Sequence, residues 1–260
     1  ADDYSNDLRL RGYTETTTDP LGLSQTNHRT DMNYSRAGDL TGYVQSDSDP
    51  HGNDSLTIWT AGTFDRYGRV LTYTEQVRDS LRVQTVRERQ STTYDSLGRQ
   101  LDFTDAVTDE YGHTTTRHWT GANYDFFNRL QRYDESNTDA LGNTTQKEWR
   151  AERYDSADRA ERYSQTNTDA DGNITRLVWS AGLPARSGEP GYNRLGQLVG
   201  YTEEFTDQWG QTHRKLWADG AYDDFGNLTS FLEINIDPAG GAVKKRWEGG
   251  LYDTHNRLTA

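Results

Sequence analysis

The sequence contains no cysteine, and it has only 5 prolines and 1 methionine in 260 residues. The missing cysteines exclude disulfides and a thiolate zinc site. No run of about 18 apolar residues occurs, as a membrane-spanning helix would need. Hydrophobic residues make up only 32%, and the mean hydropathy is -1.04, which is poor in aliphatic side chains for a compact globule. The net charge of -13 argues against a nucleic-acid backbone or an anionic membrane as partner.

Aromatic residues are the main exception to this polar composition, since the chain has 16 Tyr and 7 Trp. A disordered chain would have few of them, so they need a structural explanation. They open a repeat every 30 residues, except for one interval of 38 residues. The repeats start at Tyr4, Tyr34, Phe64, Tyr94, Tyr124, Tyr154, Tyr192, Tyr222 and Tyr252.

The longer interval lies between Tyr154 and Tyr192, and its extra residues fall in a Pro-, Gly- and Ser-rich segment at 184–191 that predicts a surface loop. We therefore interpret residues 1–260 as one continuous repeat array with a single insertion loop. The chain opens and closes inside a repeat and shows no signal peptide, so we expect an excerpt or a processed piece of a longer protein.

Two turns recur in every repeat. At the first turn an Asp, Asn or Ser is followed three residues later by Gly, Asn or Asp in eight of nine repeats, as in Asp95 and Gly98, and by Leu8 in the first. The second turn repeats this spacing. This chemistry predicts a type I turn followed by a left-handed residue, which closes a β-hairpin with a bulge. The structural residues that we expect at these turns include Asp95, Gly98, Asp139, Gly142, Asp169 and Gly172.

The third repeat departs from the pattern, because Arg82 stands where the other second turns have glycine. A side chain with a Cβ is disfavoured in the left-handed conformation. We therefore predict a different turn type or a longer loop between Asp79 and Val83.

The segments between the turns are about ten residues long and rich in Thr, Tyr, Trp and Val, which favour strands. The sequence therefore predicts an all-β fold of tandem two-stranded repeats, joined into an antiparallel meander of about 17 strands. Open sheets beyond about ten strands tend to curl. We expect a single layer curled into a spiral or shell.

Two aromatic columns fall in the middle of these strands. One column is Tyr13, Tyr43, Tyr73, Phe103, Tyr133, Tyr163, Tyr201 and Phe231; the other is Trp59, Trp119, Trp149, Trp179, Trp217 and Trp247. Arg29 and Arg89 replace Trp in the first and third repeats. The hairpin register brings the columns together, so we favour cross-strand stacking that stabilises the sheet. The alternative is that the Trp column provides platforms for glycans.

The motifs FDRYGRV (64–70), YDSLGRQ (94–100), YDFFNRL (124–130) and YDDFGNL (222–228) resemble the YD repeats of the Rhs family. TDALGNTT (138–145) and TDADGNIT (168–175) are similar to the other half of that pattern. The resemblance covers the whole chain, although common YD repeats are nearer twenty residues long, so it indicates a longer subtype. It implies a hollow β-shell, which in some members encloses a toxin, or a large secreted or cell-surface protein. We identify no toxin segment and no self-cleaving motif.

The sequence gives no indication of an enzyme, because it has no Gly-rich phosphate loop and no GxSxG elbow. Its carboxylates recur at equivalent turn positions, whereas a catalytic pair needs unequal environments. Asp169, Asp171 and Asn173 are similar to the start of a calcium loop, but the later bidentate Glu is missing. An ordinary turn is the favoured interpretation there, and we expect no cofactor.

We therefore expect a non-catalytic structural module of a large extracellular or cell-surface bacterial protein, such as a fibre, stalk or shell. Its expected partners are neighbouring repeats, with self-assembly into filaments as a possibility. Two alternatives remain: a glycan-binding adhesin that uses the Trp column, and an Rhs-type shell that encloses a toxin.

Overall fold

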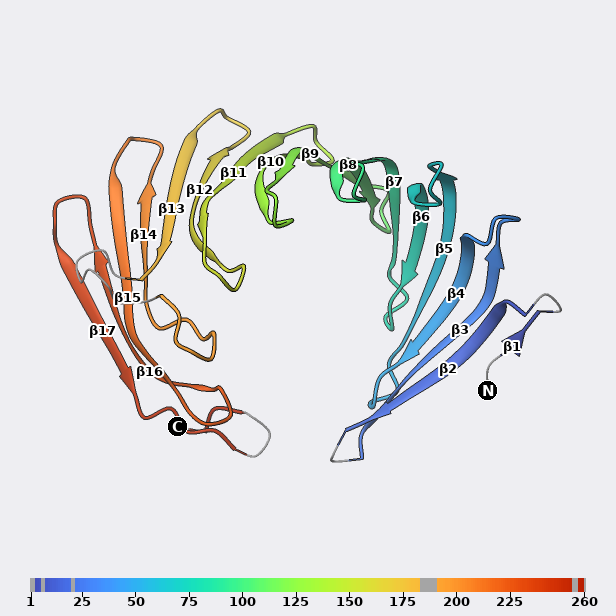
Figure 1. Ribbon diagram of the computed structural model, residues 1–260, viewed down its shortest axis with the longest axis horizontal. Helices are drawn as coiled ribbons and strands as arrows, with labels where there is room; N and C mark the ends of the chain where they lie inside the picture. The colour runs from blue at the N-terminus through green and yellow to red at the C-terminus, as the bar shows by residue number, and fades with distance from the viewer. Residues whose placement is uncertain (1–2, 6–7, 20–21, 183–190, 254–256, 260) are drawn as a thin grey trace. The chain divides into compact units, whose positions relative to one another are not determined.

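The computed structural model describes residues 3–5, 8–19, 22–182, 191–253 and 257–259. These residues form 17 β-strands and no helix. Each strand pairs antiparallel with the next along the chain, so that the strands form one open sheet (Figure 1). The predicted all-β meander of two-stranded repeats is therefore confirmed.

The strands alternate between two types that differ in their place in the repeat. The strands that follow the first turn are β2 (Leu10–Thr18), β4 (Leu40–Ser48), β6 (Val70–Arg78), β8 (Gln100–Thr108), β10 (Leu130–Thr138), β12 (Ala160–Thr168), β14 (Tyr201–Thr206) and β16 (Leu228–Ile236). The strands that follow the second turn are β3 (Ser24–Tyr34), β5 (Asp54–Phe64), β7 (Gln84–Tyr94), β9 (Thr114–Tyr124), β11 (Thr144–Tyr154), β13 (Ile174–Ala181), β15 (Thr212–Tyr222) and β17 (Ala242–Glu248). The short β1 (Asp3–Tyr4) precedes them.

The turns have the predicted conformation. Gly98 and Gly142 have φ of 86° and 88°, in the left-handed region where glycine is favoured. The N–H of Gly98 donates to the carbonyl of Asp95 at 3.1 Å, and the N–H of Asp95 donates to the carbonyl of Arg99 at 2.9 Å. These two hydrogen bonds close the loop of a type I turn with a following bulge, so the positive φ expected at both glycines is confirmed.

The different turn type or longer loop that was predicted between Asp79 and Val83 is wrong. Arg82 adopts φ of 67°, and its N–H donates to the carbonyl of Asp79 at 3.0 Å, as glycine does at the equivalent turns. Leu8 takes the same conformation with φ of 61°. The flanking hairpin and the carboxylate of Asp79, which accepts hydrogen bonds from Leu81 and Val83 at 2.9 Å each, fix the turn. Strand pairing therefore outweighs the local cost of a left-handed side chain.

A second bulge, near the end of the strands that follow the second turn, was not predicted. In β15 the pairing with β16 shifts register between Ala218 and Ala221, and in β5 it shifts between Ala61 and Thr63. A bulge of this kind increases the local twist of the strand. A Cβ on Gly220 would collide with the ring of Trp217, so glycine lets the ring lie against the backbone.

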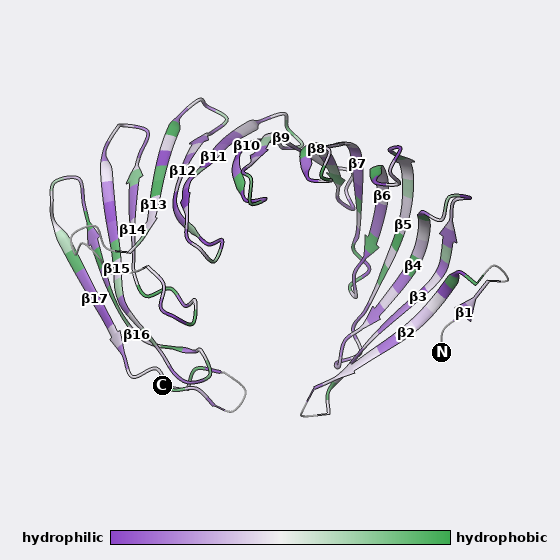
Figure 2. Ribbon diagram, in the orientation of Figure 1, coloured by the Kyte–Doolittle hydropathy of each residue, from purple (hydrophilic) through white to green (hydrophobic). Residues whose placement is uncertain are grey.

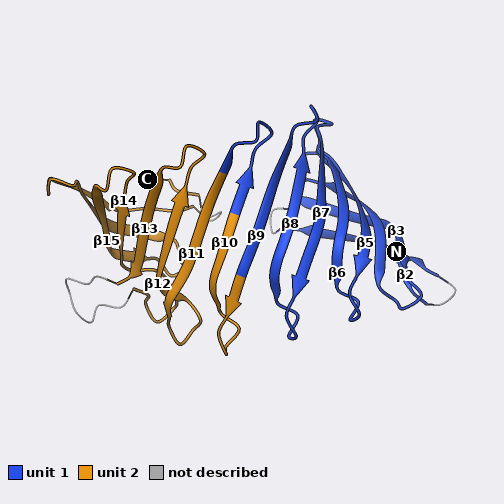
Figure 3. Ribbon diagram, turned by 90° about the horizontal axis from the view of Figure 1, so that it is seen from above, with its two compact units in different colours: residues 1–121, 136–144 blue, residues 122–135, 145–260 orange. Residues whose placement is uncertain are grey.

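The described chain divides into two compact units, which Figure 3 shows in blue and orange. Unit 1 comprises Ala1–Gly121 and Ser136–Thr144, and unit 2 comprises Ala122–Glu135 and Thr145–Ala260. Both are built from the same repeat. In unit 2 the insertion loop lies mostly outside the described residues, and the regular pattern resumes where Tyr192 bridges Leu198.

Neither unit has a conventional core. The best-buried apolar side chains include Phe103, Trp119 and Trp217, with 7%, 8% and 9% exposure, and no described large side chain is completely buried. Hydrophilic and hydrophobic segments are interspersed along the strands (Figure 2). Since successive side chains of a strand point to opposite faces, the two aromatic columns share one face of each unit, which we call the aromatic face.

Candidate functional site

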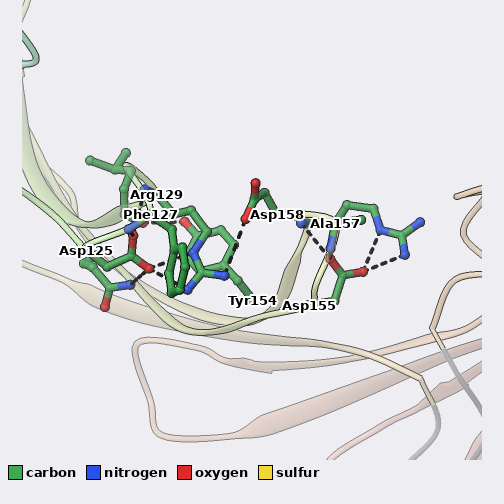
Figure 4. A network of polar contacts seen from close by, with 10 residues as sticks. Asp125, Phe127, Arg129, Tyr154, Asp155, Ala157 and Asp158 are labelled. Carbon is green, nitrogen blue, oxygen red and sulfur yellow. Dashed lines mark hydrogen bonds and ion pairs between the residues drawn. The ribbon is translucent and has the colours of Figure 1, made fainter.

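The first turn of each repeat carries a polar network, which Figure 4 shows for the fifth repeat. One carboxylate oxygen of Asp125 accepts hydrogen bonds from the backbone N–H groups of Phe127 and Arg129 at 2.9 Å each. The other oxygen accepts one from Arg129 Nε at 2.7 Å. The Asp therefore fixes the turn backbone, and it also orients the guanidinium of the same turn.

Arg129 also reaches the next repeat. Its guanidinium carbon lies 4.8 Å from the ring centroid of Phe127 and 4.9 Å from that of Tyr154. Its Nη1 lies 3.5 Å from a carboxylate oxygen of Asp158 in the neighbouring turn (Figure 4). The hydroxyl of Tyr154 in turn donates to the carbonyl of Leu130. Two successive repeats are thus joined in both directions by one Arg and one Tyr, in an arrangement that we call the turn interlock.

The turn interlock recurs along both units. Tyrosine hydroxyls donate to a carbonyl of the preceding repeat at Tyr34 (to Leu10, 2.8 Å), Tyr94 (Val70, 3.0 Å), Tyr192 (Ala160, 3.2 Å), Tyr222 (Leu198, 2.6 Å) and Tyr252 (Leu228, 2.8 Å). Arg69 and Arg159 also lie over the tyrosine of the next repeat, at 4.6 and 4.2 Å from the centroids of Tyr94 and Tyr192. The side chains that recur at the first turn therefore connect neighbouring repeats.

Where the arginine is absent, another polar pair replaces it. The hydroxyl of Ser35 donates to Asp39 at 2.9 Å, and the amide of Asn193 donates to Gln197 at 2.6 Å. Each pair bridges positions i and i+4 of the turn, as Asp125 and Arg129 do. In both turns, as in the fifth repeat, one side chain of the pair donates and the other accepts.

The second turn also begins with an Asp, but its side chain has a different partner. Asp139 accepts hydrogen bonds from the N–H groups of Leu141 and Asn143 at 2.9 Å each, and from Asn143 Nδ2 at 2.9 Å. The side-chain amide of Asn143 therefore takes the place that Arg129 Nε has at the first turn.

The turn that was considered for calcium follows the same scheme. Asp169 accepts hydrogen bonds from the N–H groups of Asp171 and Asn173 at 3.0 and 2.8 Å, and from Asn173 Nδ2 at 2.9 Å. Both carboxylate oxygens thus have partners within the turn. No group of three acidic or His side chains suited to a metal is found among the described residues. A calcium ion at Asp169, Asp171 and Asn173 stays a prediction.

These hydrogen bonds shift the acidity of the turn carboxylates. The side-chain amides of Asn143 and Asn173, followed by backbone N–H groups, lower the pKa of Asp139 and Asp169 below the ordinary value of 3.8. At Asp125, burial raises the pKa, but hydrogen bonds from the side chain and backbone of Arg129 outweigh it and lower the pKa. The same kind of hydrogen bond therefore lowers the pKa of Asp125, Asp139 and Asp169, which occupy equivalent positions of their turns.

The aromatic columns meet as predicted. In unit 2 Trp149 stacks between Tyr133 and Tyr163, with ring centroids at 5.5 and 5.9 Å. The stacking continues without interruption, and we call the row the aromatic ladder. Its further members in unit 2 are Trp179, Tyr201, Trp217, Phe231 and Trp247, with successive centroids 5.3 to 5.9 Å apart.

In unit 1 arginines complete the aromatic ladder. Arg29 lies 5.6 Å from the centroid of Tyr13 and 4.1 Å from that of Tyr43. Arg89 lies 5.5 Å from Tyr73 and 4.1 Å from Phe103. A guanidinium plane stacks on aromatic faces, so the two substitutions leave the row continuous.

The orientation of the rings bears on glycan binding. Tyr43 and Trp59, and Phe103 and Trp119, are nearly parallel, with interplanar angles of 18° and 21°. Their faces are turned toward the neighbouring strands, and each face is covered by the next ring. A sugar stacks on an open ring face. The Trp residues proposed for glycans therefore lie in the structure as a closed stack.

The sequence did not assign a role to several of these residues. The arginine of the YDxxGR motif and the hydroxyl of its tyrosine connect repeats, yet both were interpreted only as a family signature. The signal was their constant spacing from the turn Asp. No helix of the described chain has the length and hydrophobicity needed to cross a membrane.

Comparison with known proteins adds little. No protein-family model matches the chain, and no curated protein matches it. Among solved structures, the Photorhabdus luminescens Tc holotoxin pore, in a TccC3 mutant form, is similar at 12% sequence identity with a TM-score of 0.22. The match covers 98% of this chain but only 18% of that chain. A likeness this weak carries no argument about this protein's function.

Proposed function

We propose that this chain is a non-catalytic structural repeat module of a large extracellular or cell-surface bacterial protein of the YD-repeat kind. In this proposal the sheet curls into a shell, or extends as part of a fibre or stalk, and its task is shape and reach. The support comes from what the recurring side chains do. The described turn carboxylates, the tyrosine hydroxyls and the ring faces are mainly engaged in contacts within and between repeats.

The single observation that carries the proposal is the turn interlock between Arg129 and Tyr154. It joins the fifth repeat to the sixth, and its tyrosine hydrogen bond recurs at Tyr34, Tyr94, Tyr192, Tyr222 and Tyr252. In a ligand-binding surface the recurring side chains would be directed to the ligand, whereas here they contact one another. Repeated, internally satisfied contacts instead produce stability that spreads along the array, as in other repeat proteins.

The test uses Trp149→Ala in the full chain, with Trp209→Ala as its matched control. Trp149 is half-buried in the aromatic ladder, whereas Trp209 lies at a turn and is 74% exposed. We expect Trp149→Ala to speed amide hydrogen exchange in the neighbouring strands of unit 2 while distant strands keep their protection. Trp209→Ala should change exchange only at its own turn.

Binding to a panel of polysaccharides, measured on the same two variants, separates this proposal from the adhesin alternative. A scaffold predicts no binding that depends on Trp149. Unchanged hydrogen exchange together with lost polysaccharide binding in Trp149→Ala would contradict the scaffold proposal.

A further inference from the structure

A hollow of ≈ 380 Å³ opens on the aromatic face of unit 2, over strands β14 to β17. The strand pairing brings the lining residues together: Phe205 pairs with His213, Glu203 with Lys215, and Asn235 with Val243. The hollow therefore lies beyond the aromatic ladder, near the second turns, and it does not include the Trp column. Its lining includes Glu203, Phe205, His213, Lys215, Asn235 and Asp237.

One wall of the hollow lacks a side chain, because position 241 is glycine. At three other second turns the residue four positions after the Asp is an asparagine (Asn53, Asn143 or Asn173), whose amide donates to the second carboxylate oxygen at 2.7 to 2.9 Å. At the last second turn this residue is Gly241. Its N–H donates to one oxygen of Asp237 at 2.7 Å. Within the described residues, no side chain donates to the other oxygen, so it is left for an outside donor.

The charges of the lining balance one another. Glu203 and Asp237 are acidic, and the ammonium of Lys215 lies 3.9 Å from a carboxylate oxygen of Glu233. An ion of either sign gains little from such a mixture. The acidic and His side chains here do not form a group that could hold a metal among the residues described.

Balanced donors and acceptors suit a different ligand. A sugar hydroxyl both donates and accepts, so it can donate to the carboxylates of Asp237 and Glu203 and accept from the ammonium of Lys215. The side chains of Phe205 and Val243 supply apolar wall for the C–H face of a sugar ring. Small-ligand sites typically have volumes of about 300–1,000 Å³ and combine an apolar wall with a few polar groups.

We propose that this hollow binds a neutral pyranose sugar, with Asp237 and Lys215 as the main hydrogen-bonding residues and Phe205 as the stacking surface. This site is separate from the Trp column that the sequence indicated, and it is confined to one part of unit 2. It goes beyond the scaffold role, because a scaffold requires no ligand.

The test is a titration of the full chain, followed through the amide resonances of a ¹⁵N-labelled sample. The probes are D-glucose, D-galactose and N-acetyl-D-glucosamine, with D-glucuronate as the anionic comparison. We expect at least one neutral sugar to shift amides of β14 to β17 at millimolar concentration. No shift from any neutral sugar up to saturating solubility, or binding of glucuronate alone, would overturn the proposal.

Gly241→Asn is the decisive variant, because it restores the amide that closes the equivalent turns at Asn143 and Asn173. A Cβ at position 241 would meet Asp237 Oδ2 at 2.5 Å, so the carboxylate must rotate before the new amide can donate to it. Affinity should fall about tenfold or more, since the free carboxylate oxygen gains an internal partner. Lys147→Gln is the matched control, since Lys147 occupies the repeat position of Lys215 and does not line this hollow. Equal affinity in the parent and Gly241→Asn, or an equal loss in Lys147→Gln, would refute the site.

These outcomes are independent of the scaffold proposal. Loss of sugar binding in Gly241→Asn with unchanged hydrogen exchange leaves the scaffold role intact. Failure of the scaffold test at Trp149 leaves the hollow and its lining unaffected.

Discussion

Units 1 and 2 build the same aromatic ladder with different chemistry. In unit 2 every described position of the Trp column is a ring, as at Trp149 between Tyr133 and Tyr163. In unit 1 the column alternates between tryptophan and arginine, and the arginines lie over rings at 4.1 Å on their closer side. The two units show that a planar side chain is what the position requires, whether or not it is charged.

The charged version needs an additional partner. Nε of Arg29 donates to the side-chain oxygen of Gln45 at 3.0 Å, and Arg89 forms a bidentate ion pair with Asp105. The side chains of Arg89 and Asp105 are only 12% and 10% exposed. Hydrogen bonding and the charge of Asp105 raise the pKa of Arg89 against the opposing effect of burial. Both guanidinium groups that replace a ring therefore have an acceptor on the adjacent strand.

The largest effect is expected when this acceptor is removed. Asp105→Ala leaves the guanidinium of Arg89 buried without its counter-charge, which should reduce the free energy of unfolding by about 3 kcal/mol or more. The double variant Arg89→Trp with Asp105→Gln recreates the pairing of Trp149 and Gln165, and it should be close to neutral. Urea denaturation measures both. A double variant as unstable as Asp105→Ala would show that the two versions of the ladder are not interchangeable.

The reverse exchange sharpens the comparison. Trp149→Ala removes a half-buried ring from unit 2 and should cost about 2–3 kcal/mol, below the range for a fully buried tryptophan. Trp149→Arg should cost less, because Gln165 lies opposite, as Gln45 lies opposite Arg29. Trp209→Ala, at an exposed turn, is the control and should stay within about 0.5 kcal/mol of the parent. If arginine is no better than alanine at position 149, stacking on a guanidinium contributes nothing.

The turn interlock is common to both units, so matched changes should have matched effects. Tyr154→Phe removes the hydroxyl that donates to Leu130, and Tyr94→Phe removes the one that donates to Val70. Each change should cost about 1 kcal/mol, the typical value of one hydrogen bond. Tyr111→Phe is the control, because Tyr111 is 76% exposed at a turn. Denaturation midpoints that agree for all three variants would show that the hydroxyl does not connect the repeats.

A turn that differs between repeats gives a smaller effect of opposite sign. At the second turn of the third repeat, Arg82 has φ of 67°. At the equivalent position of the fifth repeat, Gly142 has φ of 88°. Arg82→Gly removes the cost of a left-handed side chain and should raise the stability by up to about 1 kcal/mol. Gly142→Val should lower it by about 1 kcal/mol or more. Thermal unfolding of the two variants checks both signs, and an Arg82→Gly variant less stable than the parent would contradict the expected cost.

The smallest change per site is expected with pH, and it should be shared by the two units. The pKa values of Asp139 in unit 1 and Asp169 in unit 2 are lowered from 3.8, first by the Asn amides and then by backbone N–H groups. A lowered folded-state pKa stabilises the fold above the unfolded value, and this contribution is lost as the pH falls through the folded value.

Stability should therefore be constant from pH 7 to about pH 5 and decline below pH 4. Asp139→Asn should show a shallower decline than the parent. Asp171→Asn is the control, because none of the described residues donates a hydrogen bond to the side chain of Asp171. Unfolding midpoints between pH 7 and pH 2 give the slopes. Identical slopes in all three proteins would exclude the turn carboxylates as the cause.

Much of this fold could be predicted because its signals are local and repeated. Asp95 and Gly98 indicate a turn by their chemistry alone, and the spacing of the turns sets the strand length. The meeting of Tyr43 and Trp59 follows from the hairpin register once the turns are placed. Arg82 shows the limit of this reasoning, since strand pairing held a residue in a conformation that its own preference disfavours.

Other features depend on neighbours that a single repeat does not show. The contact between Arg129 and Tyr154 joins different repeats, and the role of Gly220 depends on the ring of Trp217 that lies against it. Among the described residues no side chain donates to Asp237 Oδ2, and the comparison with Asn143 shows that the glycine at position 241 is the reason. These properties require the paired strands as well as the sequence.

The constant reach of the turn interlock has a consequence for the speed of folding. The hydroxyl of Tyr94 bonds to a carbonyl 24 residues earlier, and the stacked pair of Tyr43 and Trp59 is separated by only 16 residues. These separations stay the same however many repeats are joined, so the relative contact order falls as the chain lengthens. Since chains dominated by nearby contacts fold faster than other β-proteins, each repeat can acquire its structure from the one before it.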